Sequence, residues 1–108
     1  MLYTMQQVMS LVTEYLPGVP ILPAIGNNDC YYHNDAPYAN LSAQYYGDLW
    51  TVFFEEVPAN QVFLQDPVEY NNVYTSFMQG GYYALNLTSD IVLITINGIY
   101  PFYSNTIE

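Results

Sequence analysis

The sequence predicts an α/β or α+β fold in the order helix, strand, long loop, two helices and β-hairpin. Two observations lead to this prediction. Apolar residues recur at helical spacing in three separate stretches, and two β-rich runs flank a short polar turn near the C-terminus. Because 108 residues is the size of one ordinary domain, we expect residues 1–108 to form a single domain or an internal fragment of a larger one.

The N-terminal part of the chain predicts one helix, one strand and a long loop. Six apolar residues lie at the spacing of one helical face, and a Pro-Gly pair ends that helix at residue 17: Met5, Val8, Met9, Val12, Tyr15 and Leu16. The apolar run 19–25 predicts a strand, and its two prolines suit a position where no ladder hydrogen bond is needed. Residues 26–40 are rich in Gly, Asn, Asp and Pro and predict a polar loop.

The C-terminal part predicts two helices and a hairpin. Residues 42–56 place apolar side chains on one helical face, although Gly47 weakens the helix. Asp66-Pro67-Val68-Glu69 is typical of an N-cap, a proline at the first helical position and an N3 carboxylate, and Gly80-Gly81 marks the end of that third helix. The runs 82–85 and 91–97 flank the turn 86–90 and predict two paired strands. The faces expected to point inward are those of Tyr45, Leu49, Val52 and Phe53 in the second helix and Tyr70, Val73, Tyr74, Phe77 and Met78 in the third.

The charge of the chain excludes several classes of function. All ten charged side chains are Asp or Glu, which gives a net charge of −10 with no Lys or Arg. Unaided nucleic-acid binding is excluded, because that affinity comes from neutralising phosphates with Lys and Arg. Anionic membranes are disfavoured for the same reason. The carboxylates must be solvated, hydrogen-bonded, metal-bound or protonated at low pH.

Signals for export, membrane insertion and modification are few. Cys30 stands alone and favours a small half-buried thiol, and the N-terminus has no basic region of the kind that opens a signal peptide. No apolar run approaches the roughly 20 residues of a membrane span. Two sequons, beginning at Asn40 and Asn86, are candidate glycosylation sites if the chain passes through a secretory pathway.

The turn that follows the predicted strand is the candidate site. Open α/β sheets bind ligands beyond the carboxyl ends of their strands. Gly26-Asn27-Asn28-Asp29 offers two amide oxygens and a carboxylate, which are ligands for an oxygen-preferring metal or orienting groups for a phosphate. A turn closed by its own Asn and Asp side chains explains the same residues equally well.

The stretch 17–29 resembles the third signature block of calcineurin-like metallophosphoesterases, in the branch of acid sphingomyelinase-like phosphodiesterases and endopolyphosphatases. Tyr31-Tyr32-His33-Asn34 and the run from Gly80 through Leu85 into residues 91–97 are similar to the same branch. The resemblance spans about residues 5–105 in the expected order. It implies part of a metallophosphoesterase sandwich, a secreted protein or one of the lysosomal or vacuolar lumen, and hydrolysis of phosphodiester or phosphoanhydride bonds.

The resemblance also implies roles for individual residues. Asn27 takes the place of a metal ligand, Asn28 that of a histidine that contacts the substrate phosphoryl group, and Asp29 orients its neighbour. The implied cofactors are divalent metal ions of the zinc or manganese class, which clamp the attacking hydroxide and the phosphoryl oxygens. An amide at position 28 cannot give up a proton, so general-acid help would fall to His33. A structural, hydrogen-bonded histidine is the alternative for that residue.

Most of the family's metal ligands are absent. The Asp-x-His and Gly-His-x-His blocks do not occur, and one histidine cannot complete a two-metal site. The phosphate-ester substrate would also meet no Lys or Arg, so the attraction would come from the metal ions alone.

Two functions of different class follow from these observations. The chain is either a fragment or truncated relative of a secreted metal-dependent phosphoesterase, inactive alone, or an acidic, Tyr-rich structural protein without catalysis that assembles into homo-oligomers or filaments. The second reading depends on the uncharged run 91–96, which has no lysine to protect a strand edge.

Overall fold

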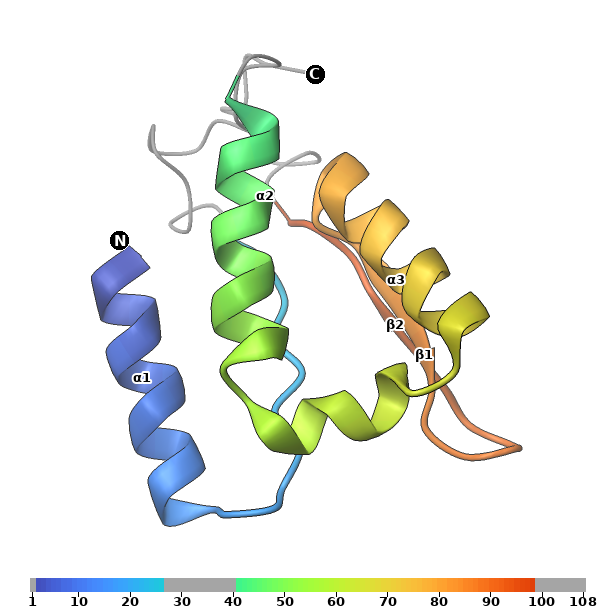
Figure 1. Cartoon of the computed structure of the whole chain (residues 1–108), viewed down its shortest axis with the longest axis horizontal. Coiled ribbons are helices and arrows are strands. Elements are labelled where there is room, and N and C mark those ends of the chain that lie inside the picture. The colour runs from blue at the N-terminus through green and yellow to red at the C-terminus, as the bar shows by residue number, and fades with distance from the viewer. Residues whose placement is uncertain (1, 27–40, 99–108) are drawn as a thin grey trace.

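The computed structural model describes residues 2–26 and 41–98. Three α-helices, a π-helical turn, a 3₁₀ helix and two strands follow one another along the chain (Figure 1). Their bounds are α1 Leu2–Tyr15, α2 Ser42–Trp50, η1 Thr51–Glu55, η2 Pro58–Leu64, α3 Pro67–Gly80, β1 Tyr83–Asn86 and β2 Val92–Thr95. Within these two described stretches, no helix is long and apolar enough to cross a membrane.

α1 confirms the first predicted helix, but it packs against the rest of the molecule along a narrow strip. Met9 is its one buried side chain, Met5 packs partly against the core, and Val8 and Tyr15 of the predicted inward face are exposed. The chain leaves the helix through Gly18, whose φ of 78° is the left-handed conformation that glycine adopts without strain. α1 contacts η1, so it lies on the outer side of the α2–η1 helix (Figure 1).

The predicted strand at residues 19–25 is wrong for the described structure, because this segment pairs with no strand there. Pro20 and Pro23 have no N–H group to donate to a ladder. The backbone of Ile21 instead bonds to the side chain of Asn60, and the carbonyl oxygen of Ile25 accepts from the N–H of Gly98 at 2.9 Å. The segment is therefore held at points along its length and not by a continuous strand partner.

The predicted second helix is confirmed in extent, since α2 continues into the π-helical turn η1 up to Glu55. All four side chains expected to point inward are buried. The π turn rotates one more residue toward the core, so Phe53 and Phe54 are both buried. The connection that follows contains the 3₁₀ helix η2.

The third helix begins and ends at the residues the sequence predicts. The Asp66 carboxylate accepts hydrogen bonds from the N–H groups of Val68 and Glu69, at 2.8 and 3.2 Å. Gly81 closes the helix with a φ of 72° and donates its N–H to the Phe77 carbonyl oxygen. Phe77 faces the core, where its ring lies within 6.1 Å of five other aromatic rings: Tyr46, Trp50, Phe53, Phe54 and Tyr83.

The predicted hairpin is confirmed, with β1 and β2 antiparallel and Tyr83 opposite Thr95. Tyr83 and Leu85 face the core, whereas Ala84, Val92 and Ile94 lie on the outer face. This two-stranded antiparallel sheet is all the strand structure in the described residues. The described fold is thus mostly helical with one antiparallel hairpin, which agrees with the α+β alternative of the prediction. The described strands form one two-stranded sheet and not the two layers of the expected sandwich.

Candidate functional site

The structure does not test most of the predicted site residues. The predicted catalytic residues Asn28, Asp29 and His33 lie outside the described residues. The same holds for the predicted metal ligand Asn27 and for Asn40 of the first sequon. Asn86 of the second sequon is described and exposed. The described structure does show how the chain is held directly before the predicted turn.

Three separate parts of the chain meet where the segment 19–26 ends. Ile25 is buried and accepts the hydrogen bond from Gly98, and Gly81 at the end of α3 lies against its side chain. The Asn97 side chain, 4% exposed, donates to the Gly80 carbonyl oxygen at 3.0 Å and to the Tyr46 hydroxyl oxygen at 3.4 Å. We call this meeting point of residues 25–26, 80–81 and 97–98 the glycine junction.

The close approach at the glycine junction explains why glycine occupies position 81. A Cβ atom there would lie 2.7 Å from Cδ1 of Ile25 and 2.8 Å from Cε1 of Tyr46, closer than carbon atoms approach in folded proteins. The φ of 72° also lies in the region that side chains rarely adopt. Gly81 therefore lets the end of α3, α2 and the segment 19–26 touch.

Two side chains hold the earlier part of the same segment. Asn60, fully buried in η2, accepts from the Ile21 N–H at 2.7 Å and donates to the carbonyl oxygens of Ile21 and Phe53, both at 2.6 Å. The Asn60 amide thus satisfies both backbone groups of Ile21, as the backbone of a neighbouring strand would. Tyr83 of β1 donates its hydroxyl proton to the Pro23 carbonyl oxygen at 2.6 Å. Burial raises the pKa of Tyr83, partly offset by a hydrogen bond with Thr95, so the hydroxyl stays protonated and able to donate.

Sequence reasoning missed Asn60. The residue lies in a stretch without helical or strand periodicity, and nothing in its neighbours marks it as buried. An asparagine between proline and apolar residues is equally typical of an exposed turn. Its role depends on a partner 39 positions away, which no local pattern contains.

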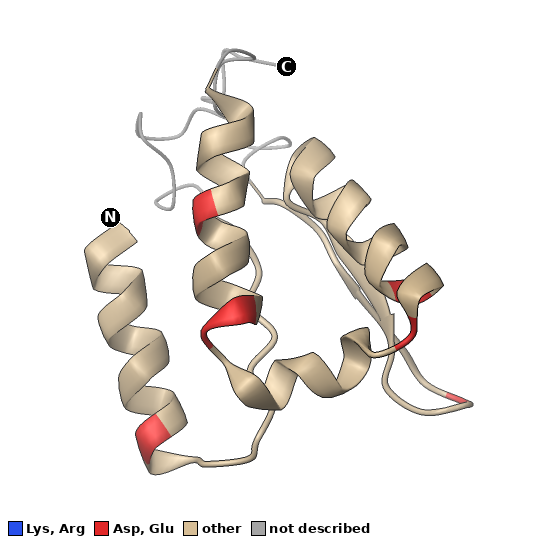
Figure 2. Ribbon diagram, in the orientation of Figure 1, with Lys and Arg blue, Asp and Glu red and all other residues tan. Residues whose placement is uncertain are grey.

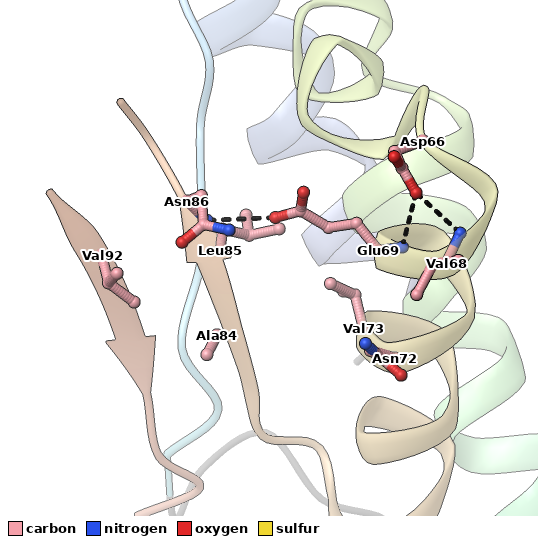
Figure 3. Close-up of a pocket in the computed structure, with 9 residues that line it drawn as sticks. All are labelled: Asp66, Val68, Glu69, Asn72, Val73, Ala84, Leu85, Asn86 and Val92. Carbon is pink, nitrogen blue, oxygen red and sulfur yellow. Dashed lines mark hydrogen bonds between the residues drawn. The ribbon is translucent and has the colours of Figure 1, made fainter. Parts of the chain in front are cut away.

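A second feature is a cavity of about 490 Å³ between the first turns of α3 and the hairpin (Figure 3). Both polar and apolar side chains line it. The Glu69 carboxylate, which accepts from the backbone N–H of Asn86 at 3.2 Å, ties one wall to the other. The lining consists of Asp66, Val68, Glu69, Asn72 and Val73 from α3 and Ala84, Leu85, Asn86 and Val92 from the hairpin.

The described carboxylates do not form a metal site. Among residues 2–26 and 41–98, no three His, Cys, Asp or Glu side chains lie close enough together to hold a metal ion. The carboxylates are scattered over α1, α2, the end of η1, the start of α3 and the hairpin turn (Figure 2). Asp66 is already engaged as the cap of α3. The donor set of the described residues therefore does not fit the two-metal site that the resemblance implies.

Comparison with known proteins yields one distant relative. No family model matches the chain, and no solved structure gives a significant match. The chain is 25% identical over 105 residues to the sphingomyelinase phosphodiesterase C of Dictyostelium discoideum, a match that covers 96% of this chain. It spans about a fifth of the length of that relative, 20%.

Proposed function

We propose that this chain is the part of a metal-dependent phosphoesterase domain that carries the turn at residues 27–29. The similarity to the Dictyostelium phosphodiesterase, which runs along nearly the whole chain, is the observation that supports this proposal. In this role the described residues act as a frame. Asn60, Tyr83 and the glycine junction hold the segment 19–26, and this segment leads directly into the turn.

The proposed reaction is hydrolysis of phosphodiester or phosphoanhydride bonds. We assign Asn27 as a ligand to one of the divalent ions, Asn28 as a hydrogen-bond donor to a phosphoryl oxygen and Asp29 as the residue that orients it. Bound zinc or manganese ions would activate water and neutralise the phosphoryl oxygens. Since the described residues do not supply the remaining ligands, we place those ligands elsewhere in a longer polypeptide. A lumenal or secreted location, with phosphate esters as substrates, belongs to the same proposal.

The first prediction concerns the isolated chain. We expect it to show no turnover of bis(p-nitrophenyl) phosphate above the rate of the free metal ion when zinc or manganese is added. The physical reason is that the chain has one histidine and that the carboxylates of its described residues do not gather into a metal-binding group, so two metal ions are not held in place. Release of p-nitrophenol across a metal titration is the measurement, and metal-dependent turnover by the chain alone would show that it holds a complete site.

A chimaera tests whether the chain can serve as the proposed frame. The matching fifth of the Dictyostelium relative is replaced by this chain, and hydrolysis of the same diester is followed. We expect the chimaera to retain activity and an Asn27→Ala chimaera to lose at least roughly 100-fold, as removal of a metal-binding or transition-state group does. An Asn71→Ala chimaera, changed at an exposed residue of α3, is the matched control. A folded chimaera in which Asn27→Ala has no effect contradicts the assignment of Asn27.

A second candidate function, self-assembly, is favoured by the outer face of the hairpin. Ile91 and Val92 are each 56% exposed, Ile94 is 73% exposed and Ile96 is 68% exposed. None of the strand residues carries a charge, so nothing in β2 opposes pairing with another chain. We define this hairpin face by Val92, Ile94 and Ile96.

A further prediction concerns this hairpin face. If the chain assembles, the Ile94→Lys variant should sediment as a monomer at a concentration at which the unchanged chain is assembled. The reason is that a lysine on an edge strand must lose its hydration when the strand pairs. Val62→Lys places the same charge at a similarly exposed apolar position on η2, 57% exposed, and should leave the association unchanged. Added salt should strengthen the assembly, since it screens repulsion between two chains of net charge −10. An unchanged sedimentation profile for Ile94→Lys would exclude the hairpin face as the interface.

A further inference from the structure

We propose that Asn86 carries an N-linked glycan and that the first sugars of this glycan lie in the cavity between α3 and the hairpin. The inference is independent of phosphoesterase activity. It depends on the sequon, on the exposure of its asparagine and on the residues that line the cavity beside it.

The acceptor is presented at the end of a strand. Asn86 is the last residue of β1, and its side chain is exposed and makes no hydrogen bond with any of the other described residues. Thr88, the third residue of the sequon, shapes the turn by accepting hydrogen bonds from the N–H groups of Asp90 and Ile91 at 3.2 and 3.1 Å. The Asn86 amide is therefore presented on a defined turn, beside the cavity that it helps to line.

The cavity begins at the point of attachment. Asn86 itself lines it, and its cross-strand partner Val92 lies on the same face of the hairpin (Figure 3). The volume of about 490 Å³ falls within the roughly 300–1,000 Å³ of small-molecule sites. A sugar bound to Asn86 would therefore have room beside the strand, between β1 and the start of α3.

The chemistry of the lining suits a neutral carbohydrate. Sugar hydroxyl groups donate to carboxylates. Asp66 caps α3 through Oδ1 and Glu69 accepts from Asn86 through Oε1, so Oδ2 and Oε2 are the oxygens that can accept from a sugar, with the amide of Asn72 beside them. Val68, 70% exposed, and Val92 offer apolar contact to the C–H face of a sugar ring. An anionic ligand would be repelled by the same carboxylates.

The attachment step is the ordinary transfer to an asparagine amide. The Nδ2 atom of Asn86 attacks C1 of the sugar of a lipid-diphosphate oligosaccharide, a C–N bond forms, and the bond from C1 to the diphosphate oxygen breaks. The lipid diphosphate leaves with the bonding electron pair, and Nδ2 loses one proton. An oligosaccharyltransferase of the secretory pathway supplies the donor and the catalysis.

Attachment is tested first, in eukaryotic cells that express the full chain behind an added secretion leader, so that native targeting does not affect the result. Asn40→Gln leaves Asn86 as the one acceptor, and Asn40→Gln with Asn86→Gln leaves none. Endoglycosidase shift and glycopeptide mass spectrometry should find a glycan on the first variant and none on the second. Secreted Asn40→Gln chain without a glycan would overturn the proposal.

Occupation of the cavity is tested by thermal unfolding. The glycosylated Asn40→Gln chain is compared with the same variant made in the bacterial cytosol, where it receives no glycan. We expect the glycan to raise the melting midpoint by roughly 4 °C, and Val92→Thr to remove most of that increment. Val62→Thr, at a similarly exposed valine remote from the cavity lining, is the matched control and should preserve it. An increment that is absent, or equal in all three backgrounds, would show that the sugars project into solvent.

Discussion

Replacing Asn60 with alanine is expected to lower the free energy of unfolding by about 4 kcal/mol, since three backbone groups, one buried and two partly buried, lose their partner at roughly 1–3 kcal/mol each and a small void remains. The side chain is fully buried and bonds to both the N–H and the carbonyl oxygen of Ile21, as well as to the Phe53 carbonyl oxygen. The segment 19–26 has no strand partner that could replace these bonds. Urea unfolding followed by tryptophan fluorescence measures the change, because Trp50 lies in the core.

Asn71→Ala is the matched control for this change. Asn71 is exposed on α3, so the same atoms are removed where water already solvates the amide. We expect a change within about 0.7 kcal/mol, in the stabilising direction, because alanine has the higher helix propensity. If Asn60→Ala costs no more than Asn71→Ala, the Asn60 side chain does not hold the segment.

Replacing Gly81 with alanine is expected to cost about 3 kcal/mol. Roughly 1 kcal/mol comes from placing a Cβ atom in the left-handed conformation, with φ of 72°. The remainder is overpacking, since the new atom would lie 2.7 Å from Ile25 and 2.8 Å from Tyr46, and both side chains are buried in the core. The same urea titration measures the loss.

Gly18→Ala separates the two causes. Gly18 has a φ of 78°, but a Cβ atom added there would meet no atom within 4 Å. Gly18→Ala should therefore lower the free energy of unfolding by the backbone strain alone, about 1 kcal/mol. Equal costs at positions 18 and 81 would mean that the glycine junction tolerates a methyl group and is looser than its distances indicate.

Both changes act on the residues that lead into the proposed site. Asn60 holds the segment 19–26 near its start, and Gly81 allows α3 and α2 to close on Ile25 near its end. If the phosphoesterase proposal is correct, a chimaera that carries Gly81→Ala should therefore lose activity even where it remains folded, because the proposed site residues 27–29 follow directly after the displaced segment.

The sequence predicts well the features that depend on neighbouring residues. Asp66 followed by proline and an N3 carboxylate marks the start of α3, because a cap needs only N–H groups two and three residues away. The hairpin is predicted for a similar reason, since its strands are joined by a short turn. The inward face of the second helix follows from helical spacing alone.

The same reasoning fails where the partner of a residue lies far away in the sequence. The run 19–25 has the composition of a strand, but whether it becomes one depends on which backbone lies beside it, and the structure places there the Asn60 side chain and Gly98. Tyr70 and Tyr74 match the inward pattern of α3, yet each remains 38% exposed, stacked on the other and packed edge-on against Trp50.

The sequence by itself determined the acidic charge, the helices, the cap of α3, the hairpin and the resemblance that led to the phosphoesterase proposal. Only the tertiary structure decided that residues 19–26 are held by side-chain and junction contacts, that Gly81 is required at a close approach and that Asn86 borders a cavity. The physical reason is the separation along the chain of the residues that interact. Local backbone geometry and hydrogen bonds between near neighbours are encoded within a few residues, whereas burial and long-range pairing exist only once separate segments have packed together.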